Sequence, residues 1–319
     1  AETERRIREQ LPALTPISDG VSAAVARQYN ENPYPRWRHG DYFGAQVPLP
    51  EYLHGLGVPT DHLAGANILI AGAGTGKQVM RVARQIRAAR IVAVDLSAAS
   101  LAFAKRQTDR AGFTGIQYGI ADILRLSEAS DLQNRFDMIE CSGVLHHTGD
   151  PALGLANLAG CLKRGGIMHL DLYSRHARAA VYDARALITA RGDAPTPEGI
   201  RAFRAHIIAM RLGQIPARPA AELLLARDFF SLSGCRDLAF NVQELTYDAA
   251  EIGALIRGAG LNLLGFRFEE NASGQAFAQK YAARFPQDQY VRDIDSIAAF
   301  EQENPSAFLS MYHFFVQKP

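Results

Sequence analysis

A glycine-rich loop follows a short apolar run at residues 68–70 and leads into apolar residues at helical spacing over residues 79–86. Its glycines are Gly72, Gly74 and Gly76. This order predicts a strand buried on both faces, a tight turn and a helix. Glycine suits such a turn because a Cβ atom would block a ligand's approach to the backbone, and because tight turns often require positive φ. The loop therefore predicts a binding site for a nucleotide-like ligand.

The spacing of the glycines distinguishes the ligand classes that use such loops. A phosphate-binding P-loop has glycine where this chain has Ala71, and a hydroxyl residue where it has Gln78. The dinucleotide fingerprint has its third glycine at the position of Lys77. The remaining pattern, G-x-G-x-G, disfavours a P-loop and, less strongly, a dinucleotide site.

Acidic residues end the next two strand-like runs. Residues 90–95 end in Asp95, nineteen positions after the last loop glycine, where a ribose diol would be bound. Residues 115–122 end in Asp122, and a fourth run, residues 135–141, leads into another loop. Alternating strands and helices predict a parallel sheet with helices on both faces. The carboxyl ends of such strands meet at one edge, so these loops should share a single cleft.

The order of these motifs resembles that of the class I S-adenosylmethionine-dependent methyltransferases. The matching segments are the glycine loop, Asp95, Ala121-Asp122, Phe136–Ile139 and Leu162–Gly166. The resemblance implies an α/β fold with a doubly wound, seven-stranded, mostly parallel sheet whose last strand is antiparallel. It also implies S-adenosylmethionine as the cofactor.

Three further segments resemble bacterial methyltransferases that are often fused behind tetratricopeptide repeats. They are residues 29–37, 233–238 and 311–318. The function of that family is not established, so the resemblance identifies no substrate. The chain begins with Ala1 and not with methionine. An N-terminal repeat domain that is absent from this chain, in a longer protein, would be consistent with the resemblance.

The resemblance implies that the glycine loop lies beside the methionine part of the cofactor. It also implies that Asp95 binds the ribose hydroxyls and that Asp122, with Ile123, contacts the adenine. Carboxylates suit these roles because diols and exocyclic amines offer hydrogen-bond donors. The predicted cofactor-binding residues are Gly72, Ala73, Gly74, Gly76, Asp95, Leu96, Asp122, Ile123, Cys141 and Gly143. Ile70 departs from the family, because many members carry an acidic residue at that position. Contacts to the methionine end are therefore expected to be rearranged or weaker.

Two adjacent histidines, His146 and His147, follow the fourth predicted strand, where members of the family line the transfer site. Adjacent side chains diverge by about 100° on a helix and point oppositely on a strand, so at most one should face the cleft. We predict His146 as a catalytic residue that acts as a base or orients a nucleophile, and His147 as a substrate contact. The alternative is that both are ordinary loop histidines. A metal site including Asp150 lacks the i, i+4 spacing of helical ligands, so no metal is predicted.

An aromatic, proline-stiffened segment lies well before the first predicted strand. It contains Tyr29, Tyr34, Arg36 and Trp37. We predict that Tyr29 acts in catalysis and that the other three bind substrate, as parts of a lid over the cofactor. The alternative is a rigid turn whose aromatic rings fill the core.

The chain is divided accordingly into four parts. We predict an N-terminal helical and aromatic cap at residues 1–65 and a cofactor-binding α/β core at residues 66–173. A helical insertion over the active site should follow at residues 174–235, and the C-terminal part of the core, with the last strands, at residues 236–319. A chain of 319 residues with 48% hydrophobic composition is large enough for a domain with such additions.

Charge and cysteine content narrow the partners and the environment. The chain has 34 basic and 33 acidic residues, so no global field attracts a polyanion, and nucleic acid is not expected as a partner. Its three cysteines form no Cys-x-x-Cys pair, which disfavours a disulfide framework or a zinc ribbon. No apolar run approaches the ~20 residues needed to span a bilayer, and the charged opening is no secretory signal. We predict a cytoplasmic protein without a membrane partner.

These features predict a methyltransferase. We expect transfer of a methyl group from S-adenosylmethionine to an unidentified small-molecule acceptor or protein side chain. Two alternatives from other classes stay open. One is a non-catalytic module that binds the same cofactor, and the other is a nicotinamide-dependent oxidoreductase.

Overall fold

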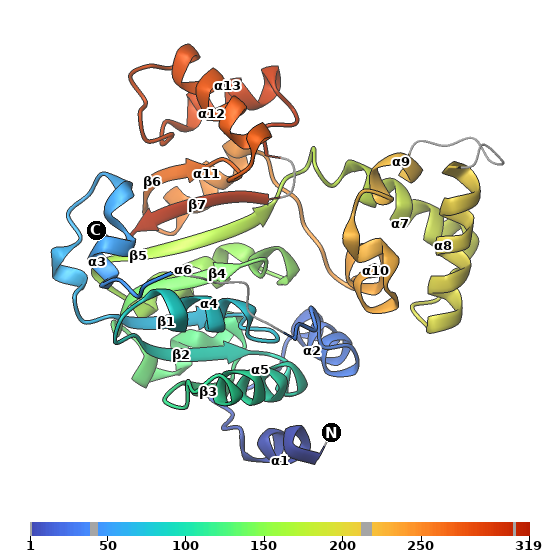
Figure 1. The fold of residues 1–319 in the computed structure, drawn as a ribbon, viewed down its shortest axis with the longest axis horizontal. Helices are drawn as coiled ribbons and strands as arrows, with labels where there is room; N and C mark the ends of the chain where they lie inside the picture. Colours follow the sequence, from blue (N-terminus) through green and yellow to red (C-terminus); the bar gives the residue numbers. More distant parts are fainter. Residues whose placement is uncertain (1, 39–43, 212–218, 309–310) are drawn as a thin grey trace.

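A seven-stranded sheet organises the molecule, and the computed structural model describes residues 2–38, 44–211, 219–308 and 311–319 (Figure 1). The strand order is β3-β2-β1-β4-β5-β7-β6. The strands are β1 (Asn67–Ala71), β2 (Arg90–Asp95), β3 (Gln117–Ile120), β4 (Phe136–Ser142), β5 (Leu162–Tyr173), β6 (Asn262–Arg267) and β7 (Met311–Gln317). Neighbours pair in parallel, except that β7 runs antiparallel to both β5 and β6. The predicted fold class, including the antiparallel last strand, is confirmed.

Alternate residues of the central strands enter two separate cores. On β1, Leu69 packs into one core, whereas Ile68 and Ile70 pack into the other. The helices of the first core are α6 (Pro151–Cys161), α11 (Ala249–Gly258), α12 (Ala272–Arg284) and α13 (Ile294–Glu303), and those of the second are α3 (Leu49–Tyr52), α4 (Lys77–Gln85) and α5 (Ala98–Arg110). Because helices cover both faces, these strands are apolar on both sides.

Side-chain caps fix where several helices begin beside the cavity. Ser97 accepts a hydrogen bond from the third residue of α5, and Asp150 does the same for α6, whose first residue is Pro151. Ser231 caps α10 (Leu232–Ala239) in the same way. Such caps satisfy backbone donors that a helix start leaves unpaired, so the loops leading into these helices are held in place.

The N-terminal segment contains α1 (Glu2–Gln10) and α2 (Gly20–Glu31), and Figure 1 shows α2 beyond the carboxyl ends of β1 and β2. The segment is tied to the edge of the sheet, because the Leu14 amide donates to the Ile120 carbonyl at 2.8 Å. Short 3-10 turns complete this segment and the core. They are η1 (His54–Leu56), η2 (Asp61–Leu63), η3 (Ile123–Glu128), η4 (Ser130–Leu132) and η5 (Leu145–His147).

A helical insertion follows β5 and has a core of its own (Figure 1). Its elements are α7 (Ala179–Arg191), α8 (Pro197–Arg211), α9 (Pro219–Leu223), η6 (Arg227–Phe230) and α10. The predicted boundary at residue 235 falls inside α10. Leu238, which lies beyond that boundary, belongs to the same core as Cys235. Residues 212–218 of the predicted insertion lie outside the described residues. None of the helices in the described ranges is long and apolar enough to cross a membrane.

Candidate active site

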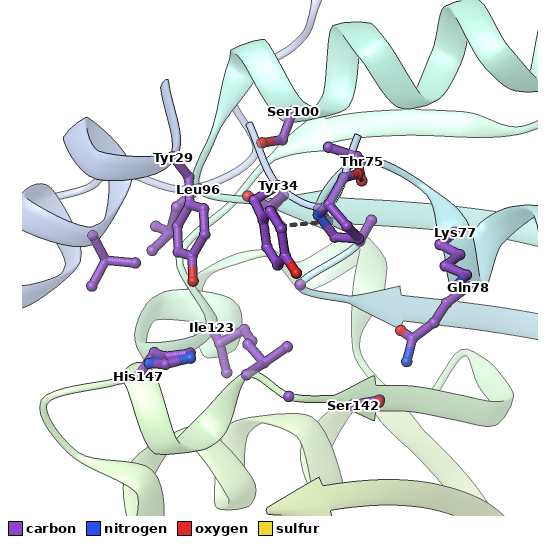
Figure 2. A pocket seen from close by; sticks show the side chains of 18 of the residues that line it. Tyr29, Tyr34, Thr75, Lys77, Gln78, Leu96, Ser100, Ile123, Ser142 and His147 are labelled. Carbon is purple, nitrogen blue, oxygen red and sulfur yellow. Dashed lines mark hydrogen bonds between the residues drawn. The ribbon is translucent and has the colours of Figure 1, made fainter. Parts of the chain in front are cut away.

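A cavity of about 510 Å³ opens at the carboxyl edge of the parallel strands. The loops after β1, β2, β3 and β4 line it, together with α2, the turn after α2, and α10. Figure 2 shows Tyr29 and Tyr34 side by side, with His147 on one side of them and Lys77 on the other. Segments that are distant in the sequence therefore share one cavity.

The three loop glycines have different physical reasons to be glycine. All have positive φ, at +73°, +50° and +83° for Gly72, Gly74 and Gly76. A Cβ atom on Gly72 would lie 2.3 Å from Val144, and one on Gly76 would lie 2.6 Å from Ala104. Near Gly74, the nearest atom would be the Tyr34 carbonyl oxygen at 3.8 Å. Gly72 and Gly74 line the cavity, whereas Gly76 is required by its packing against α5 and does not line it.

Asp95 connects the ends of β1 and β2. The Gly74 amide donates to its Oδ2 at 2.7 Å, and the Ser97 amide donates to its Oδ1 at 2.7 Å. Burial raises the pKa of Asp95, and these backbone hydrogen bonds oppose that shift. Each carboxylate oxygen can accept more than one hydrogen bond, so Asp95 retains capacity for a hydroxyl donor from a ligand.

Asp122 carries an unpaired acceptor. Its Oδ1 accepts from the Leu124 amide at 2.9 Å, whereas its Oδ2 is buried without a partner among the described residues. Asp122 lines the cavity together with Leu96 and Ile123. A buried polar atom without a partner is destabilising, so this oxygen is suited to accept a donor from a bound ligand.

Cationic and amide side chains line the cavity beside the glycine loop. They are Lys77, Gln78 and Arg81, all on the first part of α4. The Arg81 guanidinium forms an ion pair with Glu140 at 2.9 Å. Glu140 is the register neighbour of Ile70, so β4 carries a carboxylate next to the position where β1 lacks one. This end of the cavity can hold an anionic group.

The two predicted histidines occupy different positions. His147 lines the cavity, and its Nδ1–H donates to the Gln243 carbonyl at 2.6 Å, which leaves a lone pair on Nε2. His146 is fully buried and does not line the cavity. Its ring stacks on Tyr173 at 3.8 Å, and its Nδ1 accepts from the Tyr173 amide. Burial lowers the pKa of both histidines, so both rings are neutral at pH 7.

Tyr29 and Tyr34 line the cavity and are held by carboxylates of the insertion. The Tyr29 hydroxyl donates to Asp237 at 2.7 Å, and the Tyr34 hydroxyl donates to Asp228. Asp237 also lines the cavity. Burial raises the pKa of Asp237 to about 6, and the hydrogen bond from Tyr29 opposes this shift. We call Tyr29, Tyr34 and Asp237 together with Tyr173 the tyrosine wall.

Sequence reasoning missed the two carboxylates of α10 and η6. Asp237 lies within residues 233–238, a segment that supported the family resemblance but received no role. Polar contacts of the same segment dock it onto the cap. Asn32 donates to the Ser233 carbonyl at 3.2 Å, and Arg236 forms an ion pair with Glu31 at 2.6 Å.

Three other predicted residues lie outside the cavity lining. Trp37 donates from its indole nitrogen to the Thr75 carbonyl at 2.9 Å, and its ring meets Phe103 edge-on at 6.1 Å. Arg36 is exposed and lines a separate hollow of about 260 Å³. Cys141 is buried in the core beneath the cavity. Of the remaining predicted residues, those that line the cavity are Ala73, Leu96, Ile123 and Gly143.

An ion-pair chain crosses β4, β5 and β7. His169 contacts Glu140 at 2.8 Å and Asp171 at 3.2 Å, and His313 contacts Asp171 at 2.6 Å and Glu269 at 3.4 Å. Within the described part of the chain, His169, Asp171 and His313 are the one group that brings possible metal-ligand atoms within 4.8 Å of one another. These atoms already pair with each other as alternating charges, so we interpret the group as an ion-pair chain.

Comparisons with known proteins agree with this geometry. Residues 62–193 match the family described as a methyltransferase domain. An uncharacterized protein of Synechococcus sp. is 30% identical over 281 residues, which cover 81% of this chain and 63% of that protein. The ubiquinone biosynthesis O-methyltransferase of Azotobacter vinelandii is 29% identical over 154 residues, which cover 47% of this chain and 62% of that protein. The chain thus spans less than two thirds of the length of these relatives.

A solved structure has the same fold. PKMT2 from Rickettsia typhi, in complex with AdoHcy, superposes with a TM-score of 0.63 at 18% identity, covering 86% of this chain and 54% of that chain. Residues 62–193 thus match a methyltransferase domain, and the chain shares the fold of PKMT2. The family match agrees with the predicted methyltransferase class, whereas the likeness to repeat-fused proteins stays a prediction.

Proposed function

We propose that this chain transfers a methyl group from S-adenosylmethionine to a small-molecule acceptor or protein side chain that binds between the glycine loop and α10. The observation that carries the proposal is the composition of one cavity. Gly74, Asp95 and Asp122 face it from the ends of three successive strands, and Tyr29 and Asp237 line it from outside the sheet.

The residues of the first group fit the cofactor chemically. Asp95 would accept hydrogen bonds from the ribose hydroxyls, and the unpaired Oδ2 of Asp122 would accept one from the adenine amino group. Gly74 leaves the backbone accessible beside the Tyr34 carbonyl. Lys77 and Arg81 would bind the carboxylate of the methionine part.

When bound, the cofactor supplies a methyl group on a positively charged sulfur, and this methyl passes to a nucleophile. The protein aligns the acceptor and excludes water from the site. The bonds from Tyr29 to Asp237 and from Tyr34 to Asp228 hold two rings of the tyrosine wall in position. His147 has a neutral ring at the cavity, so its Nε2 can take a proton from an acceptor.

Other functions make different demands on the same fold. A non-catalytic module needs the cofactor-binding residues but has no use for a polar second wall at the same cavity. A nicotinamide oxidoreductase is disfavoured by Lys77 at the position of the third dinucleotide glycine. The name of the Azotobacter vinelandii relative specifies O-methylation, so a hydroxyl group is one candidate for the group that accepts the methyl.

Calorimetry with S-adenosylmethionine, S-adenosylhomocysteine, NAD and NADH tests the proposal. We expect the two adenosyl sulfur compounds to bind more tightly than either dinucleotide. Asp95→Ala should weaken S-adenosylmethionine binding by ~1–3 kcal/mol because a ribose acceptor is lost. Asp109→Ala is the control, since Asp109 pairs with Lys105 on α5 and lies outside the cavity lining. Tighter binding of a nicotinamide dinucleotide would refute the proposal.

A further inference from the structure

We propose that the methyl acceptor is a cationic amine, and that Asp237 binds its ammonium group within the tyrosine wall. This inference rests on the methyl-transfer function proposed above. It concerns the acceptor half of the cavity, to which the family match assigns no ligand.

The contacts of Asp237 leave part of its carboxylate for a ligand. One oxygen accepts from the Tyr29 hydroxyl at 2.7 Å, and no ion pair to Asp237 is found among the described residues. The nearby Arg178 is already paired, since its Nε donates to Glu244 at 2.9 Å. Asp237 thus lines the cavity as a carboxylate that forms no ion pair in the described part of the chain, and Arg178 acts on it only from a distance. Asp237 is partly buried, and a counter-charge would stabilise a carboxylate in such a place.

The cationic side chains that line the cavity lie on a different helix from Asp237. Lys77 and Arg81 lie on α4 beside the glycine loop, whereas Asp237 lies on α10 next to Tyr29. Asp228, which Tyr34 contacts, places a second carboxylate behind the same wall. An anionic acceptor would be repelled there, and a neutral alcohol would leave the charge of Asp237 uncompensated. An ammonium group compensates it directly.

The rings around Asp237 favour the same ligand. Tyr29, Tyr34 and Tyr173 all line the cavity, and the faces of aromatic rings attract cations. The Tyr173 ring is engaged by Arg178 at 4.1 Å and by His146 at 3.8 Å. Tyr29 and Tyr34 have no such ring contacts in the described structure, and Figure 2 shows both rings within the cavity.

The acceptor chemistry balances without a further reactant. The bound ammonium group loses a proton to the Nε2 of His147, which passes it to water, and the nitrogen lone pair then forms a bond to the methyl carbon. The carbon–sulfur bond breaks with its electron pair remaining on sulfur. The nitrogen that has formed this bond is itself a methylammonium cation, so Asp237 contacts a cation before and after transfer. Burial raises the pKa of Asp237 to about 6, so the carboxylate is ionised at pH 8.

Binding of small probes tests the charge preference directly. The full chain, with S-adenosylhomocysteine, is mixed at pH 8 with n-butylamine, n-butanol or butyrate, and binding is followed by saturation-transfer NMR and titration. We expect binding of butylamine and not of the other two. Asp237→Asn keeps an acceptor for Tyr29 but removes the charge, and should weaken butylamine by on the order of tenfold. The control, Asp193→Asn, removes a carboxylate that pairs with Arg191 in the same insertion, and should change nothing.

Chemical blocking of acceptors tests transfer. Cell extract is treated with an amine-acetylating succinimidyl ester or with iodoacetamide, and labelled methyl incorporation from S-adenosylmethionine is compared. We expect amine acetylation to abolish labelling and iodoacetamide to leave it. Labelling that survives acetylation would overturn the inference.

The same measurements separate the remaining outcomes. If Asp237→Asn weakens S-adenosylmethionine but leaves S-adenosylhomocysteine and butylamine unchanged, the carboxylate serves the sulfonium and the amine assignment is wrong. Intact cofactor binding without butylamine binding would also refute the amine assignment alone. Failure of the unmodified chain to bind S-adenosylmethionine would instead refute the proposed function.

Discussion

The two walls of the cavity are built in different ways. The cofactor-binding wall, defined by the glycine loop, Asp95 and Asp122, comes from residues 72–123 and from the ends of paired strands. The tyrosine wall joins side chains that are far apart in the sequence, since Tyr29 and Asp237 are separated by 208 positions. The first wall is positioned by the sheet itself, whereas the second depends on docking of the insertion onto the cap.

The two walls also differ in whether their carboxylates form ion pairs. On the cofactor side, Glu140 is neutralised by Arg81 at 2.9 Å and by His169 at 2.8 Å. On the acceptor side, Asp237 and Asp228 accept hydrogen bonds from tyrosines and form no ion pair within the described residues. Paired charges are compatible with a stable fold, whereas partly buried carboxylates without an ion pair are better explained by a ligand. Three changes test this contrast.

The largest effect is expected from Gly74→Val, which places a side chain into the cofactor-binding wall. Gly74 has φ +50° and no atom but the Tyr34 carbonyl oxygen near its Cβ position. The new side chain would occupy ligand space, and calorimetry should show S-adenosylmethionine affinity reduced by about 100-fold or more. The backbone strain alone should cost about 1–2 kcal/mol of stability.

Gly112→Val is the matched control for this substitution. Gly112 has φ +86° and open space around its Cβ position, but it lies in the turn after α5 and does not line the cavity. Its variant should show similar strain in thermal unfolding with cofactor affinity unchanged. Wild-type affinity in Gly74→Val would mean that the cofactor binds elsewhere.

The second prediction concerns the ion-pair chain beside the cofactor-binding wall. Burial disfavours a charged His169, but Glu140 and Asp171 outweigh it and raise its pKa to about 10. The unfolded value lies near 6.5, so this stabilisation is complete below about pH 6.5 and is lost as the pH rises toward about 10. The free energy of unfolding should therefore fall by about 2–4 kcal/mol across this interval.

Denaturant titrations at pH 6, 8 and 9.5 measure that loss. Asp171→Asn removes one of the two carboxylates that hold the charge on His169, so the fall above pH 6.5 should become smaller. His54→Gln changes an exposed histidine on η1 and should leave the profile as in the unmodified chain. If the free energy of unfolding of Asp171→Asn depends on pH as in the unmodified protein, the ion-pair chain does not stabilise a charged His169.

Much of the fold could be predicted because its signals are local. The apolar run of β2 coincides with residues 90–95 as predicted, since a buried parallel strand must be apolar on both faces. The glycine loop and the acidic strand ends were also readable, because strand ends of a parallel sheet converge whatever the surrounding helices do.

The tyrosine wall could not be predicted in full, because its members meet only through tertiary docking. Residues 232–239 form an ordinary amphipathic helix, and nothing local shows that Asp237 would reach Tyr29. The histidines illustrate the same limit. Local geometry indicated that at most one would face the cavity, but the stacking of His146 on Tyr173, which decides which one, involves another strand.

The ion-pair chain lies between these cases. His169 and Asp171 are two residues apart on β5, so their shared face follows from the strand period. Their contact with His313 depends on the register that pairs Asp171 with His313 across β5 and β7, which the sequence does not specify. The shared face of His169 and Asp171 could therefore be predicted from the sequence, but their contact with His313 could not.

The smallest effect on stability is expected at the tyrosine wall. Tyr29→Phe keeps the ring but removes a hydroxyl that donates to Asp237 and accepts from Asn241 at 3.1 Å. Stability should fall by only about 1 kcal/mol, the scale of one hydrogen bond. Turnover should fall far more, because the ring and the carboxylate lose the bond that fixes their relative position, while cofactor affinity changes little.

Tyr118→Phe separates this positioning role from the general loss of a buried hydroxyl. The Tyr118 hydroxyl is paired with Thr108 at 2.9 Å, where α5 packs on the sheet, and neither residue lines the cavity. Both variants should therefore lose similar stability in denaturant titrations, but only Tyr29→Phe should lose turnover. Equal turnover in the two variants would mean that the Tyr29 hydroxyl only holds α2 and α10 together. A larger loss of cofactor affinity than of turnover would assign the tyrosine to the cofactor-binding wall, because the hydroxyl would then be holding the cofactor and not the acceptor.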